Sequence, residues 1–198
     1  MKTLVYQSFR TSDVPGWVTR CMKSVRGWAA DRGFDYQFFD DRFFEYAPDW
    51  YREKVKHHRL LVGDLARLEL AKKFLAEGYD RTIWIDTDVI VFDSENFNVD
   101  IREDLAFCRN IWIEVNQDGS LDLRNYINNT VSVYQAGNKM LDFYIHACQA
   151  IVTHTKPPLR HNWVGTQFLT QLSHAMPFEV LNSVGMFSPT ISHDIVAG

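Results

Sequence analysis

Cysteine is scarce in this chain of 198 residues, which contains only Cys21, Cys108 and Cys148. Their number is odd, and their spacing matches neither a zinc site nor a disulfide framework. Free thiols are the usual state in a reducing compartment. We therefore expect three free cysteines and a cytoplasmic protein.

Long apolar runs and an excess of positive charge are also missing. No run approaches the roughly 20 residues of a membrane-spanning helix, and Met1–Tyr6 enters a strand-like run without a signal-peptide pattern. Lys and Arg total 21 against 25 Asp and Glu, a net charge of −4. This balance argues against nucleic acid as a partner. Peripheral association with a membrane and the oligomeric state stay open.

Two nucleotide-binding signatures are absent as well. No G-x-G-x-x-G follows the first expected strand, which removes the usual dinucleotide fingerprint. No loop rich in Lys and Gly suggests nucleotide activation, so a nucleotidyltransferase or a phosphatase-like enzyme has little support.

The composition that is present describes a folded α/β chain. Hydrophobic residues make up 46% and aromatic residues 14%, which predicts one globular domain with a sizeable core. A strand over residues 3–9, a helix over 17–30 and a strand over 34–39 form the order of a parallel βαβ unit. Further strands are expected over 105–115 and 128–134, and further helices over 139–153 and from 163.

A helix over residues 63–78 is the clearest single element. Asp64 is placed to cap its start, and Gly78 ends it. Asp64 and Arg67 are three residues apart and share a face. The alternative to a functional role for this pair is a helix cap with a local ion pair.

Residues 42–61 mix aromatic and basic side chains, which could stack a base and meet phosphates. The alternative is a packed surface helix with a solvated basic face. At the other end, within the tail over residues 186–194, Pro189 suggests that residues 192–194 leave the body of the fold as a loop.

The most informative stretch is residues 79–92, in which Asp86 and Asp88 interrupt an apolar run. If the run is one strand, both carboxylates point to the same face. Two adjacent carboxylates repel each other, and a divalent cation would remove that penalty. Oxygen ligands suit Mn²⁺ or Mg²⁺. The alternative is a strand that ends in a solvated turn.

Together, Gly63-Asp64-Leu65-Ala66-Arg67 and Ile83–Asp88 resemble the Asp-x-x-Arg and Asp-x-Asp motifs of one glycosyltransferase family. It is the family with the DXD-containing sugar-binding region, which includes the yeast initiating α-1,6-mannosyltransferase and, more distantly, the glucosylating clostridial toxins. The resemblance is best over residues 34–92. It implies a GT-A fold in one domain, with residues 1–92 as the nucleotide-sugar half and 93–198 as the acceptor half.

The resemblance also implies roles for single residues. Asp86 would meet the ribose and the metal, Asp88 would ligate Mn²⁺ or Mg²⁺, and His193 would add a further metal ligand. The other implied site residues are those that hold the donor sugar (Gly63, Asp64, Arg67), those that line the nucleoside (Gln7, Ser8), an Asn-x-Gly counterpart whose glycine is replaced by Thr130 (Asn128), and an acceptor-side catalytic residue (Gln167).

The expected function is therefore a metal-dependent glycosyltransferase of the hexosyltransferase type. It would use a nucleotide diphosphate sugar, a UDP-sugar first of all, and transfer the sugar to a glycan or small-molecule acceptor with retention of configuration. The rival interpretation is a GT-A-like protein that binds a sugar nucleotide or a glycan without turnover.

Overall fold

The computed structural model describes residues 1–56, 58–156 and 158–198. Its strands are β1 (Thr3–Ser8), β2 (Asp35–Phe39), β3 (Arg81–Ile85), β4 (Leu105–Val115), β5 (Leu121–Gln135) and β6 (Glu179–Phe187). Its helices are α1 (Gly16–Asp31), the 3₁₀ helix η1 (Asp41–Tyr46), α2 (Asp49–Lys54), α3 (Arg59–Ala76), α4 (Met140–His154), α5 (Thr166–Ala175) and α6 (Pro189–Ala197). The predicted helices and strands up to residue 85 and from 105 to 154 are present, with shifted ends.

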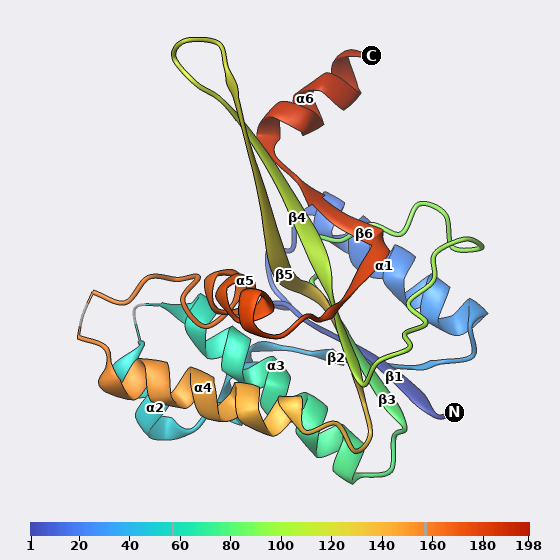
Figure 1. Ribbon diagram of the computed structural model, residues 1–198. Helices are drawn as coiled ribbons and strands as arrows, with labels where there is room; N and C mark the ends of the chain where they lie inside the picture. Colours follow the sequence, from blue (N-terminus) through green and yellow to red (C-terminus); the bar gives the residue numbers. More distant parts are fainter. Residues whose placement is uncertain (57, 157) are drawn as a thin grey trace.

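The six strands form one mixed sheet in the order β2-β1-β3-β5-β4-β6 (Figure 1). β1 pairs in parallel with both β2 and β3, so the predicted βαβ unit is confirmed. β5 runs antiparallel to β3 and β4, and β6 is parallel to β4. The α/β class, with a Rossmann-like mixed sheet flanked by helices as expected for a GT-A chain, is confirmed.

Helices cover both faces of the sheet. On one face, α1 places Val25 and Trp28 against Val5 and Ile83. On the other face, α3 and α4 pack against alternate residues of the same strands, such as Tyr6 and Trp84. Because successive strand residues point to opposite faces, the continuous apolar runs of β1 and β3 serve both cores.

The chain reverses its direction of travel across the sheet between β1 and β3. From β1 it passes through α1 to β2 on one side, and then through α3 to β3 on the other side. In open α/β sheets, ligands bind outside the carboxyl ends of the strands at such a reversal. Residues that follow Ser8 and Ile85 therefore lie where a ligand is expected.

Beyond this edge, β4 and β5 continue as a long hairpin, with α6 beside it at the end of β6 (Figure 1). The prediction of a loop for residues 192–194 is wrong, because they belong to α6. Pro189 occupies the first turn of α6, where proline is tolerated, and the buried Ser188 caps the helix by accepting a hydrogen bond from the Ile191 amide at 3.4 Å. Among the described residues, none of the helices combines the length and hydrophobicity of a bilayer-spanning segment.

Candidate functional site

The strand that carries the acidic motif is shorter than predicted. β3 ends at Ile85, Thr87 and Asp88 form a turn, and residues 89–92 are not in a strand. The argument that Asp86 and Asp88 share a strand face is therefore wrong. The turn arises where β3 stops: the Asp86 amide still donates to Thr130 O at 2.8 Å, and the Val89 amide then folds back to Asp86 O at 3.2 Å.

Asp86 is held in place by one of its two carboxylate oxygens. Its Oδ1 accepts a hydrogen bond from Trp84 Nε1 at 2.5 Å and faces Arg67 at 3.4 Å. Within the described residues, no hydrogen bond reaches Oδ2, and 29% of the side chain is exposed. Burial raises the pKa of Asp86 to about 6, which Arg67 opposes and Asp88 reinforces. The protein thus fixes the Asp86 carboxylate through Oδ1 and leaves Oδ2 accessible.

Asp64 and Arg67 form the predicted pair, but inside the molecule. Arg67 donates to Asp64 Oδ1 at 2.8 Å, and their side chains are only 10% and 8% exposed. We call Asp64, Arg67 and Asp86 the buried ion cluster. It contains two carboxylates and one guanidinium, and the exposed Asp88 follows directly. The negative excess of this region is favourable for a bound cation.

The prediction that Asp64 caps a helix is wrong. α3 begins at Arg59, so Asp64 lies in its second turn, on the face buried with Leu61 and Leu65. A carboxylate is tolerated there because Asn129 Nδ2 donates to its Oδ1 at 2.9 Å, in addition to Arg67. Burial raises the pKa of Asp64, and Arg67 and Asn129 oppose that effect.

Arg67 is almost fully engaged by the protein. Its donors reach Asp64, Asp86, the Asn129 carbonyl at 2.9 Å and the Gly63 carbonyl at 3.4 Å. Its guanidinium also lies 5.0 Å from the centre of the Trp84 ring. Burial lowers the pKa of the guanidinium, but Asp86 and Asp64 more than offset this and hold the pKa above its usual value. Gly63 contributes its carbonyl to Arg67 and lies against the rings of Phe43 and Phe44.

Sequence reasoning selected Asn128, whereas the structure places Asn129 in the cluster. Asn128 Oδ1 accepts hydrogen bonds from the amide and hydroxyl of Thr130, each at 2.8 Å, and so shapes the backbone that pairs with Asp86. The contact of Asn129 with Asp64 joins residues 65 positions apart, so no local sequence pattern predicts it. Trp84 was also missed, although its place two residues before Asp86 on a strand was a usable signal.

Gly165 brings the start of α5 against the cluster. A Cβ atom at this position would lie 3.0 Å from Asp64 Oδ2 and 3.4 Å from the Asn129 amide. Only a glycine allows this approach without displacement of its neighbours. Gln167 follows two residues later and is exposed in the first turn of α5. Its backbone amide donates to Asn162 O at 3.0 Å. Its catalytic role stays a prediction.

Gln7 and Ser8 lie at the end of β1, as predicted. Gln7 is fully buried; its Nε2 donates to the Ile85 and Asp86 carbonyls at 3.1 and 3.2 Å, and its Oε1 accepts from Tyr36 at 3.0 Å. It therefore joins the ends of β1 and β3. Ser8 is half-buried. Contact of either side chain with a nucleoside stays a prediction.

His193 lies on α6, which packs against β4 and β6 rather than against the cluster. Its side chain is 81% exposed, and its ionic neighbour is Asp194 at 3.8 Å. No hydrogen bond or ion pair of the described residues joins it to Asp86 or Asp88. The structure does not bring it to the other predicted ligands, and its metal role stays a prediction.

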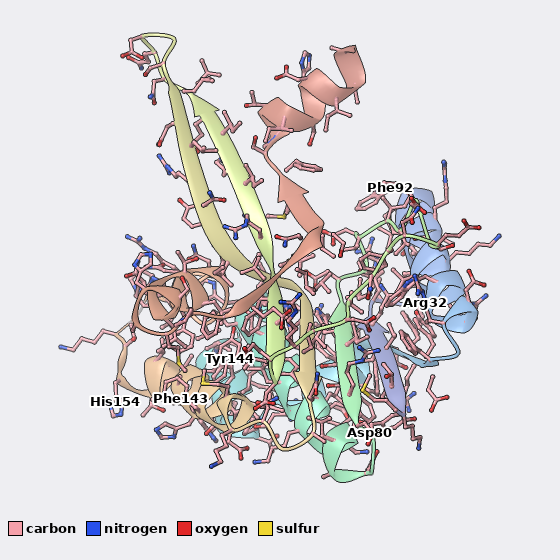
Figure 2. The ribbon with its side chains drawn as sticks, turned by 45° about the vertical axis from the view of Figure 1, so that its right-hand side comes forward. Arg32, Asp80, Phe92, Phe143, Tyr144 and His154 are labelled. Carbon is pink, nitrogen blue, oxygen red and sulfur yellow. The ribbon has the colours of Figure 1, made fainter. Side chains whose placement is uncertain are left out.

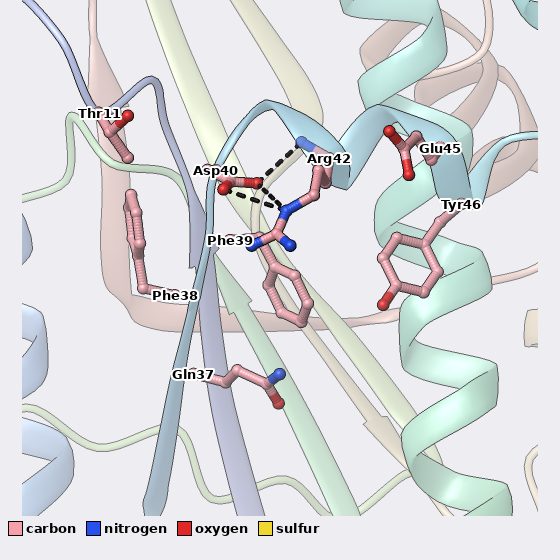
Figure 3. A pocket seen from close by; sticks show the side chains of 8 residues that line it. All are labelled: Thr11, Gln37, Phe38, Phe39, Asp40, Arg42, Glu45 and Tyr46. Carbon is pink, nitrogen blue, oxygen red and sulfur yellow. Dashed lines mark hydrogen bonds and ion pairs between the residues drawn. The ribbon is translucent and has the colours of Figure 1, made fainter.

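A cavity of about 680 Å³ opens beside the same sheet edge (Figure 3). Its wall comes from the end of β2 and from η1, where Phe38, Arg42 and Tyr46 are placed around it. Asp40 accepts hydrogen bonds from the amide and Nε of Arg42 at 2.9 and 3.0 Å, and these bonds lower its pKa. Of the aromatic and basic residues in the range 42–61, Arg42 and Tyr46 line this cavity, whereas Phe43 and Tyr51 are buried in the core.

Asp86 and Asp88 could hold a divalent cation only together with ligands from a bound substrate. Residues 1–56, 58–156 and 158–198 contain no group of three or more His, Cys, Asp or Glu side chains that could hold a metal. Asp86 and Asp88 offer two carboxylates, and within the described residues no hydrogen bond reaches Asp86 Oδ2 or the side chain of Asp88. Mg²⁺ is commonly held by one or two carboxylates together with substrate phosphates and water. Such a shared site suits these residues, whereas a cation cage made of protein side chains does not.

Comparisons with known proteins find similar solved structures. No protein-family model matches the chain, and no curated protein matches it. One similar structure is a glycosyltransferase involved in the glycosylation of the major capsid of PBCV-1, with 10% identity and a TM-score of 0.43, over 91% of this chain and 80% of that one. Another is A197 from STIV, with 12% identity and a TM-score of 0.38, over 92% and 83%.

Proposed function

We propose that this chain is a metal-dependent glycosyltransferase that transfers a sugar from a nucleotide diphosphate sugar, a UDP-sugar first of all, to a glycan or small-molecule acceptor. The observation that carries the proposal is the position of Asp86 and Asp88. They follow β3 at the reversal of strand order, and a cavity of about 680 Å³ opens at the end of β2, on the other side of β1. The Asp-x-x-Arg and Asp-x-Asp resemblance supports the same assignment.

The cavity beside η1 is the proposed nucleoside site. Its volume falls in the range of about 300–1,000 Å³ that is usual for small-molecule sites. Phe38, which is 38% exposed, and Tyr46 offer rings for a base, and Arg42 offers a cation. Ser8 lies between this cavity and Asp86, in the place that a ribose would occupy.

Asp86 and Asp88 are the proposed ligands of Mn²⁺ or Mg²⁺. When bound, such an ion would neutralise negative charge on the departing nucleotide diphosphate. Asp86 would offer Oδ2, because Trp84 and Arg67 already hold Oδ1. The fixed carboxylate needs no reorganisation when the donor arrives, which is the advantage of a preorganised site.

Arg67 acts mainly through Asp86 in this proposal. The resemblance places it near the diphosphate, yet its donors are engaged by Asp64, Asp86 and two carbonyls. It would therefore contribute positive charge and orientation. Asp64, whose Oδ2 faces the start of α5, is the proposed contact with the donor sugar. Retention of configuration is proposed from the resemblance.

Calorimetry with Mn²⁺ and UDP tests the proposal. We expect binding that requires both components and that is lost in Asp88→Asn. The matched control is Asp118→Asn in the exposed hairpin turn, which should bind as the unmodified chain does. Unchanged binding in Asp88→Asn would remove Asp88 from the metal site.

The full engagement of Arg67 favours one second candidate, a protein that binds a sugar nucleotide without turnover. Hydrolysis of a UDP-sugar in the presence of Mn²⁺ separates the two. Release of free sugar, absent in Asp88→Asn, indicates an enzyme. Binding without any release indicates the non-catalytic protein.

A further inference from the structure

A second cavity, of about 580 Å³, lies on the other side of the acidic turn. It is enclosed by the loop that begins with Val89 and by strands β4 and β6. The loop runs beside α1, where the Val91 amide donates to Ser24 Oγ at 2.9 Å, and Trp28 Nε1 holds the Phe97 carbonyl at 3.1 Å. These bonds fix the wall of the cavity, which is therefore a preformed site.

The cavity is mostly apolar, and its rim leaves large apolar side chains in water. Ile90 is 53% exposed, Phe187 50% and Phe92 92%. Figure 2 shows Phe92 at the outer side of the loop beside α1. Neighbouring exposed apolar residues are unfavourable in water and commonly mark binding sites. A ligand with an apolar body would cover them.

Arg109 gives the cavity a specific polar feature. It comes from β4, is half-buried, and takes part in no ion pair among the described residues. The other charged residue of the lining, Asp93, is occupied: its carboxylate accepts from the amide and side chain of Asn96 at 3.1 and 2.9 Å, and these bonds lower its pKa. A partly desolvated guanidinium without a carboxylate partner favours an anion, and it can bind a phosphate or carboxylate with two parallel hydrogen bonds.

We propose that this cavity binds an anionic amphiphile, a molecule with an apolar chain or ring and one phosphate or carboxylate group. The apolar part would lie between residues 89–97 and β6, and the anion would pair with Arg109. The wall begins one residue after Asp88, so the bound molecule would lie next to the acidic turn. If the proposed function holds, and only on that basis, this amphiphile is the acceptor.

Direct binding to the full chain tests the cavity, without donor and with EDTA present. The probes are decyl phosphate, decanoate, decanol and inorganic phosphate, all at concentrations below micelle formation. We expect decyl phosphate or decanoate to bind, and decanol and inorganic phosphate each to bind at least tenfold more weakly. The phosphate and carboxylate arms decide which anion is preferred. Equal binding of decanol and decyl phosphate would overturn the proposal.

Variants locate the site. Arg109→Gln should weaken decyl phosphate binding about tenfold to a hundredfold, as expected for loss of a charge-assisted hydrogen bond, and Arg109→Lys should restore part of it. Ile90→Asp, at an exposed rim position, adds a repelling charge and should weaken binding without unfolding the chain. The matched control is Arg124→Gln; Arg124 lies on the neighbouring strand β5, outside the cavity, and pairs with Asp122 and Glu114. Equal losses in Arg109→Gln and Arg124→Gln would overturn the assignment.

The two proposals fail separately. If the chain binds no UDP in the presence of Mn²⁺ while Arg109→Gln abolishes amphiphile binding, the glycosyltransferase proposal is wrong and the cavity assignment stands. If UDP binding depends on Asp88 but no amphiphile binds, the cavity assignment is wrong and the donor site stands.

Discussion

Asp86 and Asp88 are two residues apart, yet they belong to different environments. Asp86 is a member of the buried ion cluster and is held by Trp84 and Arg67. Asp88 is exposed in the turn that follows, and no hydrogen bond of the described residues holds its side chain. The protein therefore fixes one oxygen of Asp86 and leaves the other open, whereas it holds neither oxygen of Asp88 by a hydrogen bond among the described residues. The predictions below test this contrast, in order of their expected effect on the free energy of unfolding.

Arg67→Met should have the largest effect. It leaves the carboxylates of Asp64 and Asp86 without their shared cation, and loss of one partner from a buried ion pair typically lowers the free energy of unfolding by about 3–5 kcal/mol. Urea denaturation measures the loss. Arg59→Met on the same helix is the control, because its pair with Asp41 is more than 60% exposed and should be worth about 1 kcal/mol or less. Equal losses would mean that the cluster is not structural.

The pH dependence of stability should reveal Asp86. Its pKa of about 6 lies above the usual value of about 3.9 for an unfolded chain. Between these values the folded state binds the proton more tightly, so this carboxyl stabilises the fold as the pH falls through 6 towards 4, and that contribution is lost as the pH rises again. The expected size is on the order of 2 kcal/mol.

Comparison with Asp86→Asn isolates this contribution, since the other carboxyl groups titrate in both proteins. Chemical denaturation in EDTA at pH 4, 5, 6 and 7 should show a difference between the two that changes across this window. A constant difference would show that the pKa of Asp86 is not raised in the folded chain.

Gly165→Ala should be destabilising by about 1–3 kcal/mol, the usual range when a well-packed site is overfilled. The new Cβ would lie 3.0 Å from Asp64 Oδ2, so the start of α5 must move away from the cluster. Gly27→Ala is a control of opposite sign: it adds a Cβ within α1 with no atom within 4 Å, and should stabilise by about 0.4–1 kcal/mol. Thermal denaturation of both variants decides whether the close approach exists.

Asp88→Asn should have the smallest effect, within about 0.5 kcal/mol, as is usual for a surface substitution. It should also lower the pKa of Asp86 slightly, since Asp88 raises that pKa. The measurement is urea denaturation beside the Arg67→Met series. If Asp88→Asn lowered the free energy of unfolding as much as Arg67→Met does, Asp88 would be as important for stability as the buried ion cluster, and the contrast with Asp86 would be wrong.

Local patterns predicted most of the elements but not the partners of the site residues. Strands β1, β2 and β4 were predicted from their alternation and apolar content, and helices α1 and α4 from the spacing of their apolar residues. These are properties of neighbouring residues. The spacing of Asp64 and Arg67 correctly predicted a pair. The burial of this pair could not be predicted from the sequence. The residues that cover it, Asn129 of β5 and Gly165 at the start of α5, are far away along the chain.

The errors share a cause. Val89–Phe92 has the composition of a buried strand, but the Val89 amide donates to Asp86 O and the Val91 amide to Ser24 Oγ of α1, so the segment becomes a loop and Phe92 stays 92% exposed. Pro189 was interpreted as the start of a loop, and the buried Ser188 made it the first turn of a helix. In each case the supply of hydrogen-bond partners decided the outcome, and that supply depends on the tertiary structure.

By itself, the sequence determined the α/β class, the parallel βαβ unit and the position of two acids after a buried strand, because periodicity and apolar content act within a few residues. Only the tertiary structure decided that Asp64 is buried, that Arg67 is shared by Asp64 and Asp86, and that Arg109 lines an apolar cavity without an ion pair among the described residues. These properties depend on desolvation and on contacts between distant segments, and both exist only after the sheet and its helices have assembled.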